Sequence, residues 1–232
     1  MFEAAVRYPY DEGDGLRAIA IGSVLTLLGG LVIPTILVTG YALRTIRAVA
    51  DGETHPPVWD EWGALFVDGL RGTAVTVAYF LLPSVLFLGS VGLAFVPFVG
   101  GSPRAFGLIA VVVALVSLPL FLVAAYVAPA ALVGVAVTDR LGAAVAFGRL
   151  WTVVTTADYA VAWVSAVVLT LGASFLTGIL TGLTVVGGLF GAVFSFYALV
   201  AAAYLYAHGV DMTRFVGGRA APTVGDDTTG SH

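Results

Sequence analysis

The chain has 232 residues, of which 59% are apolar or aromatic and 10% are charged, and its mean hydropathy is +1.02. A soluble domain carries charge on roughly a quarter of its residues, and a folded chain of this size has too little interior to bury so much apolar surface. The composition therefore excludes a soluble enzyme, a disordered regulator and a nucleic-acid binder. It predicts one compact domain dissolved in a lipid bilayer.

The charged residues and the absent residue types narrow the possible chemistry. All ten basic residues are arginine, and the formal net charge is -4. Scattered arginines form no basic stripe for nucleic acid. The chain has no cysteine, which excludes disulfides, iron–sulfur clusters and thiol catalysis, and without lysine it holds no phosphate-binding loop of the GxxxxGK[ST] type. The acidic, mixed N-terminus predicts no cleaved signal peptide.

Five uncharged segments are each long enough to span a bilayer, which takes about 20 apolar residues. Together they predict an all-α, polytopic transmembrane helical bundle. The third segment is longer than one span needs, so we expect it to tilt or to kink at Pro119 or Pro129. The segments are 18–43, 73–99, 105–138, 160–181 and 183–207.

The two long connections hold most of the remaining charge, and each ends in an amphipathic stretch that predicts an interfacial helix, near 59–71 and near 141–154. An interfacial helix, a helix that crosses the membrane and a helix that crosses back form a unit that is loosely repeated along the chain. The bundle is therefore interpreted as three helical hairpins. Residues 1–212 then make one integral membrane domain, and 213–232 a disordered polar tail. In 59–71, helical spacing places Trp62, Leu65, Phe66 and Leu70 on one face and Asp60, Glu61, Asp68 and Arg71 on the other.

The first apolar segment has two possible topologies. It crosses the membrane once, or it breaks at Gly29-Gly30, before Pro34, into a hairpin with arms of about 20 and 25 Å. A single crossing divides the arginines 3 to 7 between the two faces, whereas a hairpin places every arginine except Arg104 on one side. Because arginine gathers on the cytoplasmic face, the hairpin is favoured. We therefore expect a multi-pass protein of the cell membrane with both termini in the cytoplasm.

Two groups of polar residues were weighed as functional sites. His55, Asp60 and Glu61 would form a metal or acid–base cluster only if they converged with Asp139 or Asp158. We favour the simpler interpretation, in which Pro56 and Pro57 set a rigid turn, the acids favour a helix N-terminus, and the tryptophans anchor the turn at the membrane surface. His208 ends the last span as an interfacial residue. We predict no catalytic residue, no cofactor and no metal.

Small residues and prolines inside the spans also have two interpretations. Small-xxx-small patterns at Gly178, Gly182, Gly187 and Gly191 permit close helix contact, either inside a hairpin or as a self-association face. The intramembrane prolines could shape a polar cavity with nearby hydroxyls. The favoured alternative is that neighbouring helices satisfy the carbonyls that the prolines free. These prolines and hydroxyl residues are Pro34, Pro83, Pro97, Pro119, Pro129, Thr35, Ser84, Ser90 and Ser117.

Several blocks carry a resemblance to a known family: 7–9, 14–16, 33–49, 56–70 and 204–206. The most specific is Pro56-Pro57 followed by Trp59-Asp60-Glu61-Trp62 and Asp68-Gly69-Leu70. The chain resembles the archaeal, largely haloarchaeal, multi-pass membrane proteins of unknown function (domain of unknown function 4013). The resemblance implies an integral protein of an archaeal plasma membrane, and it implies no catalytic residues.

The first functional hypothesis is a non-enzymatic membrane protein with a scaffold, assembly or lipid-organising role, whose partner is the bilayer itself. The second is a small transporter or channel for a neutral or lipid-like substrate, built on kinked helices. A polar-lined cavity at mid-membrane depth would favour the second hypothesis. A third, an intramembrane enzyme acting on lipid, would require the carboxylates named above to converge.

Overall fold

The computed structural model describes residues 2–10, 15–95, 103–211 and 214–215. Within these residues the chain folds into helices and connecting turns, and five helices are long and apolar enough to cross a bilayer, as the composition predicts. Two short 3-10 helices cover Tyr8–Tyr10 and Leu141–Val145. The α-helices are α1 (Phe2–Arg7), α2 (Gly15–Leu27), α3 (Val32–Ala50), α4 (Trp62–Phe95), α5 (Pro103–Thr138), α6 (Phe147–Val154), α7 (Ala157–Leu183) and α8 (Val185–Gly209).

The first apolar segment contains two helices. Helix α2 ends at Leu27 and α3 begins at Val32, so the break falls at Gly29-Gly30, where the sequence predicts it. The 13 residues of α2 extend about 20 Å and the 19 residues of α3 about 28 Å. Of the two, only α3 is long enough to cross a bilayer. Gly22 lets α2 pack closely on α8, because a Cβ there would lie 2.1 Å from the ring of Phe196.

The amphipathic stretch near 59–71, predicted to be an interfacial helix, runs without interruption into the span that follows it. Helix α4 begins at Trp62 and continues without a break to Phe95, a total of 34 residues. No proline interrupts the helix before Pro83, and the charges of its first turns are paired with charges on other helices, so nothing forces the helix to end at Gly72.

The apolar and charged faces of this stretch do not correspond to its buried and exposed sides. Leu65 from the apolar face is fully buried, and Asp68 from the charged face is only 7% exposed. Trp62 and Leu70, which share the apolar face with Leu65, are 47% and 44% exposed. The inner face of α4 is therefore set by its contact with α3.

Glycines allow α3 and α4 to cross at backbone contact. A Cβ added at Gly40 would lie 2.1 Å from the carbonyl oxygen of Leu65, and one added at Gly69 would lie 2.0 Å from that of Ile36. One turn further along α4, Gly72 faces Leu43 of α3. No larger residue fits at Gly40 or Gly69 unless the helices separate, so the two glycines fix where α3 crosses α4.

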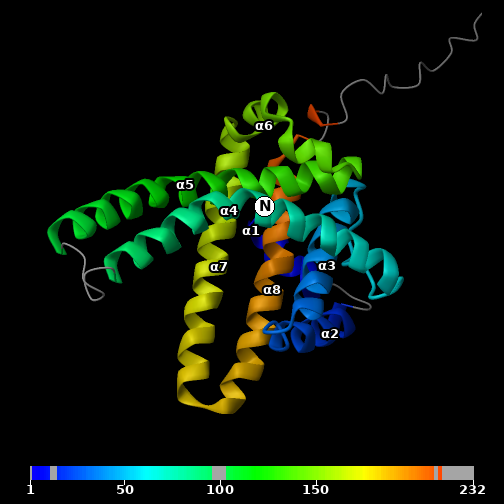
Figure 1. Cartoon of the computed structure of the whole chain (residues 1–232). Coiled ribbons are helices and arrows are strands. Elements are labelled where there is room, and N and C mark those ends of the chain that lie inside the picture. The colour runs from blue at the N-terminus through cyan, green and yellow to red at the C-terminus, as the bar shows by residue number, and fades with distance from the viewer. Residues whose placement is uncertain (1, 11–14, 96–102, 212–213, 216–232) are drawn as a thin grey trace, which may run out of the picture.

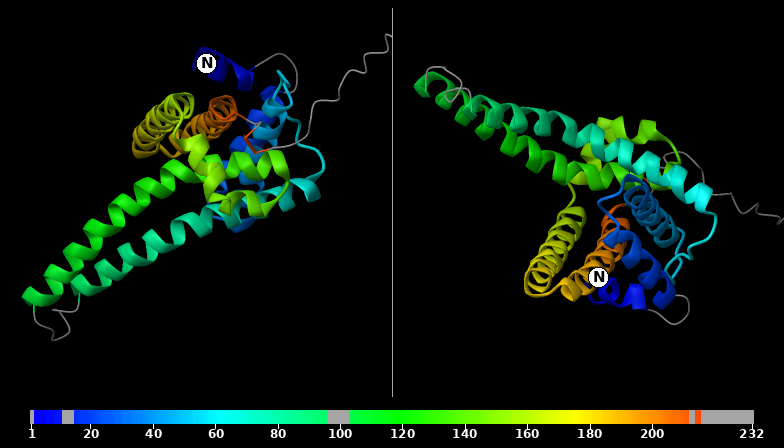
Figure 2. Two further views of the ribbon diagram at one scale, coloured as in Figure 1. Left: turned by 90° about the horizontal axis from the view of Figure 1, so that it is seen from above. Right: turned by 60° about the horizontal axis from the view of Figure 1, so that its bottom comes forward.

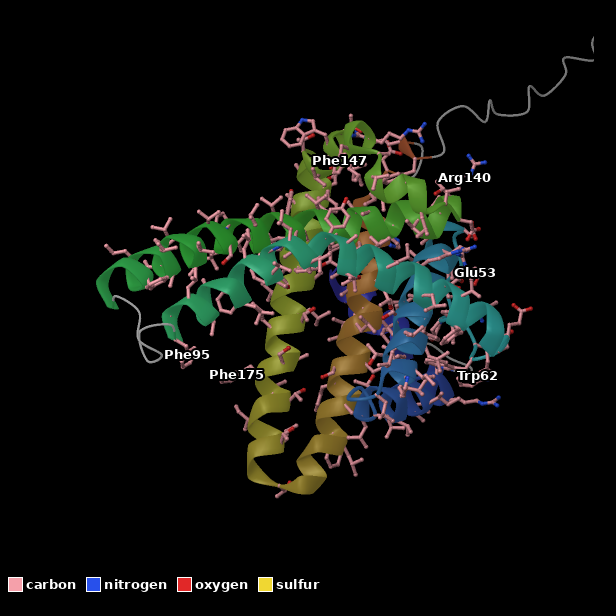
Figure 3. The ribbon with its side chains drawn as sticks, viewed as in Figure 1. Glu53, Trp62, Phe95, Arg140, Phe147 and Phe175 are labelled. Carbon is pink, nitrogen blue, oxygen red and sulfur yellow. The ribbon has the colours of Figure 1, made fainter. Side chains whose placement is uncertain are left out.

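The connection from α5 to α7 folds back over the bundle. The 3-10 helix at 141–145 and α6 occupy the region predicted to be interfacial. Leu150 and Val153 of α6 are buried against the bundle, whereas Phe147 and Trp151 are 69% and 71% exposed. Figure 3 shows Phe147 at the outer edge of the molecule. This short helix therefore keeps a buried face and an exposed aromatic face.

Helices α7 and α8 form a hairpin with a one-residue connection. Thr184 ends α7 and caps α8, since its hydroxyl accepts a hydrogen bond of 2.9 Å from the backbone N–H of Gly187. A Cβ at Gly187 would lie 1.8 Å from the carbonyl oxygen of Leu180, so the turn requires glycine there. Thr156 caps the other end of the hairpin in the same way, accepting from the N–H of Tyr159.

The two long hairpins, α4–α5 and α7–α8, leave a shared base in different directions (Figures 1 and 2). Buried side chains concentrate in this base, where α8 packs against α1, α2, α3 and α5. Beyond it the two hairpins expose large apolar side chains, Phe95 and Phe175 among them (Figure 3). The structure is therefore a packed base with two apolar arms that diverge.

The tail prediction is only partly testable, because 212–213 and 216–232 lie outside the described residues. Its prediction of disorder is wrong for Phe215. This ring is 2% exposed and packs on Gly134 of α5, where a Cβ would lie 2.7 Å from it. The guanidinium of Arg214 also donates to the carbonyl oxygen of Thr152 on α6. The chain is therefore held to the base beyond the end of α8.

Candidate functional site

Four charged residues form a network at the base, here called the base network: Arg47 of α3, Asp68 and Arg71 of α4, and Asp139 just after α5. Arg47 lies 3.0 Å from Asp68 and 2.7 Å from Asp139, and Arg71 lies 3.2 Å from Asp68 and 3.4 Å from Asp139. The Nε of Arg47 also donates to the carbonyl oxygen of Ala136 on α5. The network joins the consecutive helices α3 and α4 to the end of α5, which is far from both in the sequence.

The backbone determines how these residues meet. Asp68 directly precedes Gly69, so the close crossing of α3 and α4 brings its carboxylate to Arg47, two turns beyond Gly40. Asp139 adopts the left-handed conformation, with φ of 56°, which aspartate tolerates better than most residues. It ends α5 and is paired with both arginines.

The base network stabilises the fold and holds no free acid or base. Both carboxylate oxygens of Asp68 accept hydrogen bonds from arginine, and the two arginines balance the two aspartates in charge. A buried carboxylate without such partners would be strongly unfavourable, so Asp68 requires Arg47. The network therefore determines how α3, α4 and the end of α5 fit together.

A second ion-pair group holds the connection between α3 and α4. Arg44 contacts Asp60 at 2.5 Å and Glu61 at 3.8 Å, and Glu61 takes a left-handed φ of 46°. The tryptophan between the prolines and these acids, Trp59, stacks on Tyr41 with ring centroids 4.5 Å apart. This connection is thus anchored to α3 by charge and by aromatic contact.

The predicted candidate residues are distributed over separate places. Asp60 and Glu61 pair with Arg44, while Asp139 belongs to the base network. The ring of His55 contacts its neighbour Thr54, 3.0 Å away. The part of the chain that the structure describes contains no group of three or more histidine, cysteine, aspartate or glutamate side chains that could hold a metal ion. His208 stacks on Tyr204 at a centroid distance of 4.1 Å, and Asp158 lies in the first turn of α7.

Aromatic side chains tie the base together through hydrogen bonds to backbone carbonyls. Burial raises the pKa of Tyr8, so its hydroxyl stays neutral and donates to the carbonyl oxygen of His55 at 3.0 Å. Two of the tyrosines in this set, Tyr41 and Tyr159, are fully buried. The other donor and acceptor pairs are Tyr41 with Pro57, Trp59 with Ala18, Tyr79 with Ala144, Tyr126 with Val154, Tyr159 with Tyr126, Trp163 with Ala125, and Tyr197 with Val6.

One of these bonds shows how a proline inside a span is accommodated. Pro129 has no N–H, so the carbonyl of Ala125, four residues earlier in α5, loses its helical partner. The indole N–H of Trp163 on α7 donates to that oxygen at 2.9 Å. The favoured interpretation, in which neighbouring helices satisfy freed carbonyls, therefore holds at Pro129. Pro97 lies outside the described residues.

Three of the hydroxyls proposed to line a polar cavity donate to backbone carbonyls nearby in the sequence. Ser90 donates to Phe87, Ser117 to Ala114, and Thr35 to Leu31. Two grooves lie along the arms: one of about 430 Å³ between α5, α6 and α7, and one of about 440 Å³ between α7 and α8. Their linings are almost entirely apolar. A polar pocket of about 240 Å³ lies instead at the base, beside Arg44 and Arg47.

The glycine pattern of the last hairpin is partly used within the chain. A Cβ at Gly191 would lie 2.6 Å from the methyl group of Thr177, so Gly187 and Gly191 serve the contact between α7 and α8. Gly178 and Gly182 face open space. Self-association through these glycines stays a prediction.

Sequence reasoning missed the base network and the crossing that builds it. The available signal was the pair of small residues Gly69 and Gly72 beside a single acid, Asp68, opposite a helix that contains Gly40. Small residues at this spacing permit close helix approach, and an acid at the contact then requires a basic partner.

Fold and site together define a helical protein with apolar hairpins suited to a bilayer and a base closed by ion pairs and aromatic hydrogen bonds. The family model described as "Protein of unknown function (DUF4013)" matches residues 23–182. The chain therefore belongs to this family, as its resemblance implies. No curated protein and no solved structure matches the chain.

Proposed function

We propose that the protein is a non-enzymatic, multi-pass protein of an archaeal cell membrane with a lipid-organising or scaffold role. The observation that carries this proposal is the divergence of two apolar hairpins from one base. Both arms expose large apolar side chains along their length, so their surroundings are suited to lipid.

The distribution of polar groups supports a structural role over conduction. A transporter or channel for a neutral or lipid-like substrate needs a path lined by polar groups through the membrane. The grooves described along the arms are apolar, and the intramembrane hydroxyls of Thr35, Ser90 and Ser117 are bonded within their own helices. An enzyme acting on lipid would need free acids or bases, whereas Asp60, Glu61 and Asp139 are paired with arginines.

The proposed topology places the base and both termini in the cytoplasm. The described ion pairs of α3, α4 and α5 lie at the base, and Figure 3 shows Glu53, Trp62 and Arg140 on that side, away from Phe95 and Phe175. The natural chain has no cysteine, so single cysteines report position directly. We expect Glu53→Cys and Arg140→Cys to react with a membrane-impermeant maleimide only from the cytoplasmic face. Reaction of the two positions from opposite faces would contradict a common base.

The functional test is deletion of the gene followed by lipid and metabolite profiling. A lipid-organising role predicts a changed lipid composition or distribution with little change in soluble metabolites. An unchanged lipid profile would contradict that role. Reconstitution supplies the test of the alternative: if proteoliposomes release an uncharged solute such as glycerol faster than protein-free vesicles, the transporter hypothesis replaces ours.

A further inference from the structure

The groove between α5, α6 and α7 lies where the two arms separate. Leu122 and Val123 of α5 form one wall, Trp163 of α7 forms the other, and Trp151 and Val154 of α6 close one end. The space has a volume of about 430 Å³. The groove is therefore bounded by three separate helices, whereas an ordinary groove between packed helices is bounded by two.

Three polar side chains that line this groove already donate to backbone carbonyls. The hydroxyl of Tyr126 donates to the carbonyl oxygen of Val154 at 2.7 Å, and the indole N–H of Trp163 donates to that of Ala125 at 2.9 Å. The hydroxyl of Thr155 donates to the carbonyl oxygen of Trp151 at 2.8 Å. A polar ligand would lose its hydrogen bonds with water and gain few in return, so the lining favours hydrocarbon.

The groove is continuous with the exposed apolar surface of the arms. Leu118 and Leu122 of α5 are each 60% exposed and Val123 is 59% exposed, while Val164 and Val168 continue the apolar surface along α7 at 53% and 60%. In the proposed membrane orientation this surface faces lipid. A lipid hydrocarbon chain can therefore enter from the bilayer without crossing water.

The molecules that surround an apolar surface in a bilayer are lipids, so a lipid hydrocarbon chain is the occupant that this groove meets directly. A flexible hydrocarbon chain can follow an open apolar groove of about 430 Å³ without burying an unpaired polar group.

We propose that this groove is a lipid-binding site that holds a hydrocarbon chain of a membrane lipid against Trp151 and Trp163. The inference rests on the proposed membrane role and names the molecule that the protein organises. The groove between α7 and α8, although similar in volume, is walled by those two helices alone. We expect only transient contact with bulk lipid there.

The test uses phosphatidylcholine that carries a photoreactive diazirine on its acyl chain. The full-length protein is purified in detergent, titrated with this lipid, irradiated and digested, and the labelled peptides are identified by mass spectrometry. We expect labelling of the peptides that contain Val123 and Trp163 to saturate near one lipid per protein. An excess of unlabelled phosphatidylcholine should compete for this site.

Val123→Phe fills the mouth of the groove, where the side chain is exposed enough to avoid a clash with the core. It should lower labelling about tenfold, equivalent to ~1.4 kcal/mol in affinity. The matched control is Val116→Phe, which makes the same change on the same helix at a 51% exposed position outside the groove, and it should label like the wild type. Leu122→Trp is a second filling variant in case Val123→Phe does not fold, as judged by gel filtration.

Equal labelling of Val123→Phe and the wild type would overturn the proposal. So would labelling that rises without saturation and spreads evenly along α5 and α7, because bulk lipid gives that pattern. A different result would contradict the proposed membrane role: the protein would stay monodisperse in buffer without detergent. If the protein needs detergent but shows no saturable labelling, only the proposal of a lipid site in the groove is contradicted.

Discussion

The base and the arms of this protein are held together in different ways. At the base, α3 and α4 meet at backbone contact through Gly40 and Gly69, and buried charges and tyrosine hydroxyls are paired across helices. In the arms, each helix packs mainly on its hairpin partner and exposes large side chains such as Phe175, which is 70% exposed. Specific contacts determine the base, whereas the arms need only match the apolar solvent around them.

This difference predicts where substitutions should lower the stability of the protein most. In a bilayer the surface of an arm is as apolar as its interior, so burial adds little to the association of helices, and close packing and hydrogen bonds decide it. The base has close helix packing and hydrogen bonds between helices. In the arms, such contacts are made mainly between the two helices of each hairpin. Paired substitutions, one at the base and one in an arm, therefore test the comparison.

The largest effect is expected at the helix crossing. Gly69→Ala places a methyl group 2.0 Å from the carbonyl oxygen of Ile36, so α3 and α4 must separate. We expect the free energy of unfolding, measured in mixed micelles, to fall by at least ~3 kcal/mol. The control is Gly92→Ala on the same helix, where a Cβ meets nothing within 4 Å and alanine should be neutral or stabilising by up to about 1 kcal/mol. Equal losses at both positions would contradict the close crossing.

The next effect is expected at the C-terminal anchor. Phe215→Ala removes a ring that is 2% exposed and packs on Gly134, and it should cost about 3 kcal/mol of unfolding free energy. Phe175→Ala makes the same change at a 70% exposed position of α7 and should cost less than ~0.5 kcal/mol. If truncation of the ring at Phe215 leaves thermal unfolding unchanged, the segment after α8 is not part of the packed base.

A smaller effect is expected in the base network. Asp68→Asn keeps the shape of the side chain but removes the charge that Arg47 and Arg71 share, and we expect a loss of about 2 kcal/mol. Asp60→Asn breaks a pair whose carboxylate is 59% exposed, and it should cost at most ~1 kcal/mol. Denaturation in mixed micelles measures both. If Asp60→Asn lowers the free energy of unfolding more than Asp68→Asn does, the ion pairs of Arg44, and not the base network, contribute more to stability.

The smallest effect is expected at Pro129. Trp163→Phe keeps an aromatic ring but leaves the carbonyl of Ala125 without a donor, and hydrogen bonds between membrane helices contribute about 1 kcal/mol on average. Trp151→Phe, at a 71% exposed position, should leave the unfolding free energy unchanged. A Pro129→Ala background restores the helical N–H, so in that background Trp163→Phe should lose most of its effect. An undiminished effect would show that packing of the indole, not its hydrogen bond, matters.

Part of the fold could be predicted because lipid imposes simple rules. Uncharged runs of more than 20 residues predict spanning helices, and Gly29-Gly30 before Pro34 predicts the break between α2 and α3. The glycines at 187 and 191 predict close packing in the last hairpin, and the structure has it.

The candidate site could not be predicted, because the sequence does not show how each helix is rotated. Helical spacing places Asp68 and Arg71 on the charged face of their stretch but does not show what that face contacts. Arg47, which pairs with Asp68, lies on another helix, and Asp139, which pairs with Arg71, is 68 residues beyond it. Only the crossing at Gly69 turns Asp68 inward, and that contact depends on two glycines in two helices at once.

By itself the sequence determined the helical class, the approximate bounds of the apolar helices that are long enough to cross a bilayer and the break at residues 28–31, because these depend on local hydropathy and on backbone preferences. The tertiary structure alone decided which side chains face inward, how charges pair across α3, α4 and α5, and that the two arms diverge. The reason is physical: in lipid the outer and inner faces of a helix are equally apolar, so no periodic signal records which face packs.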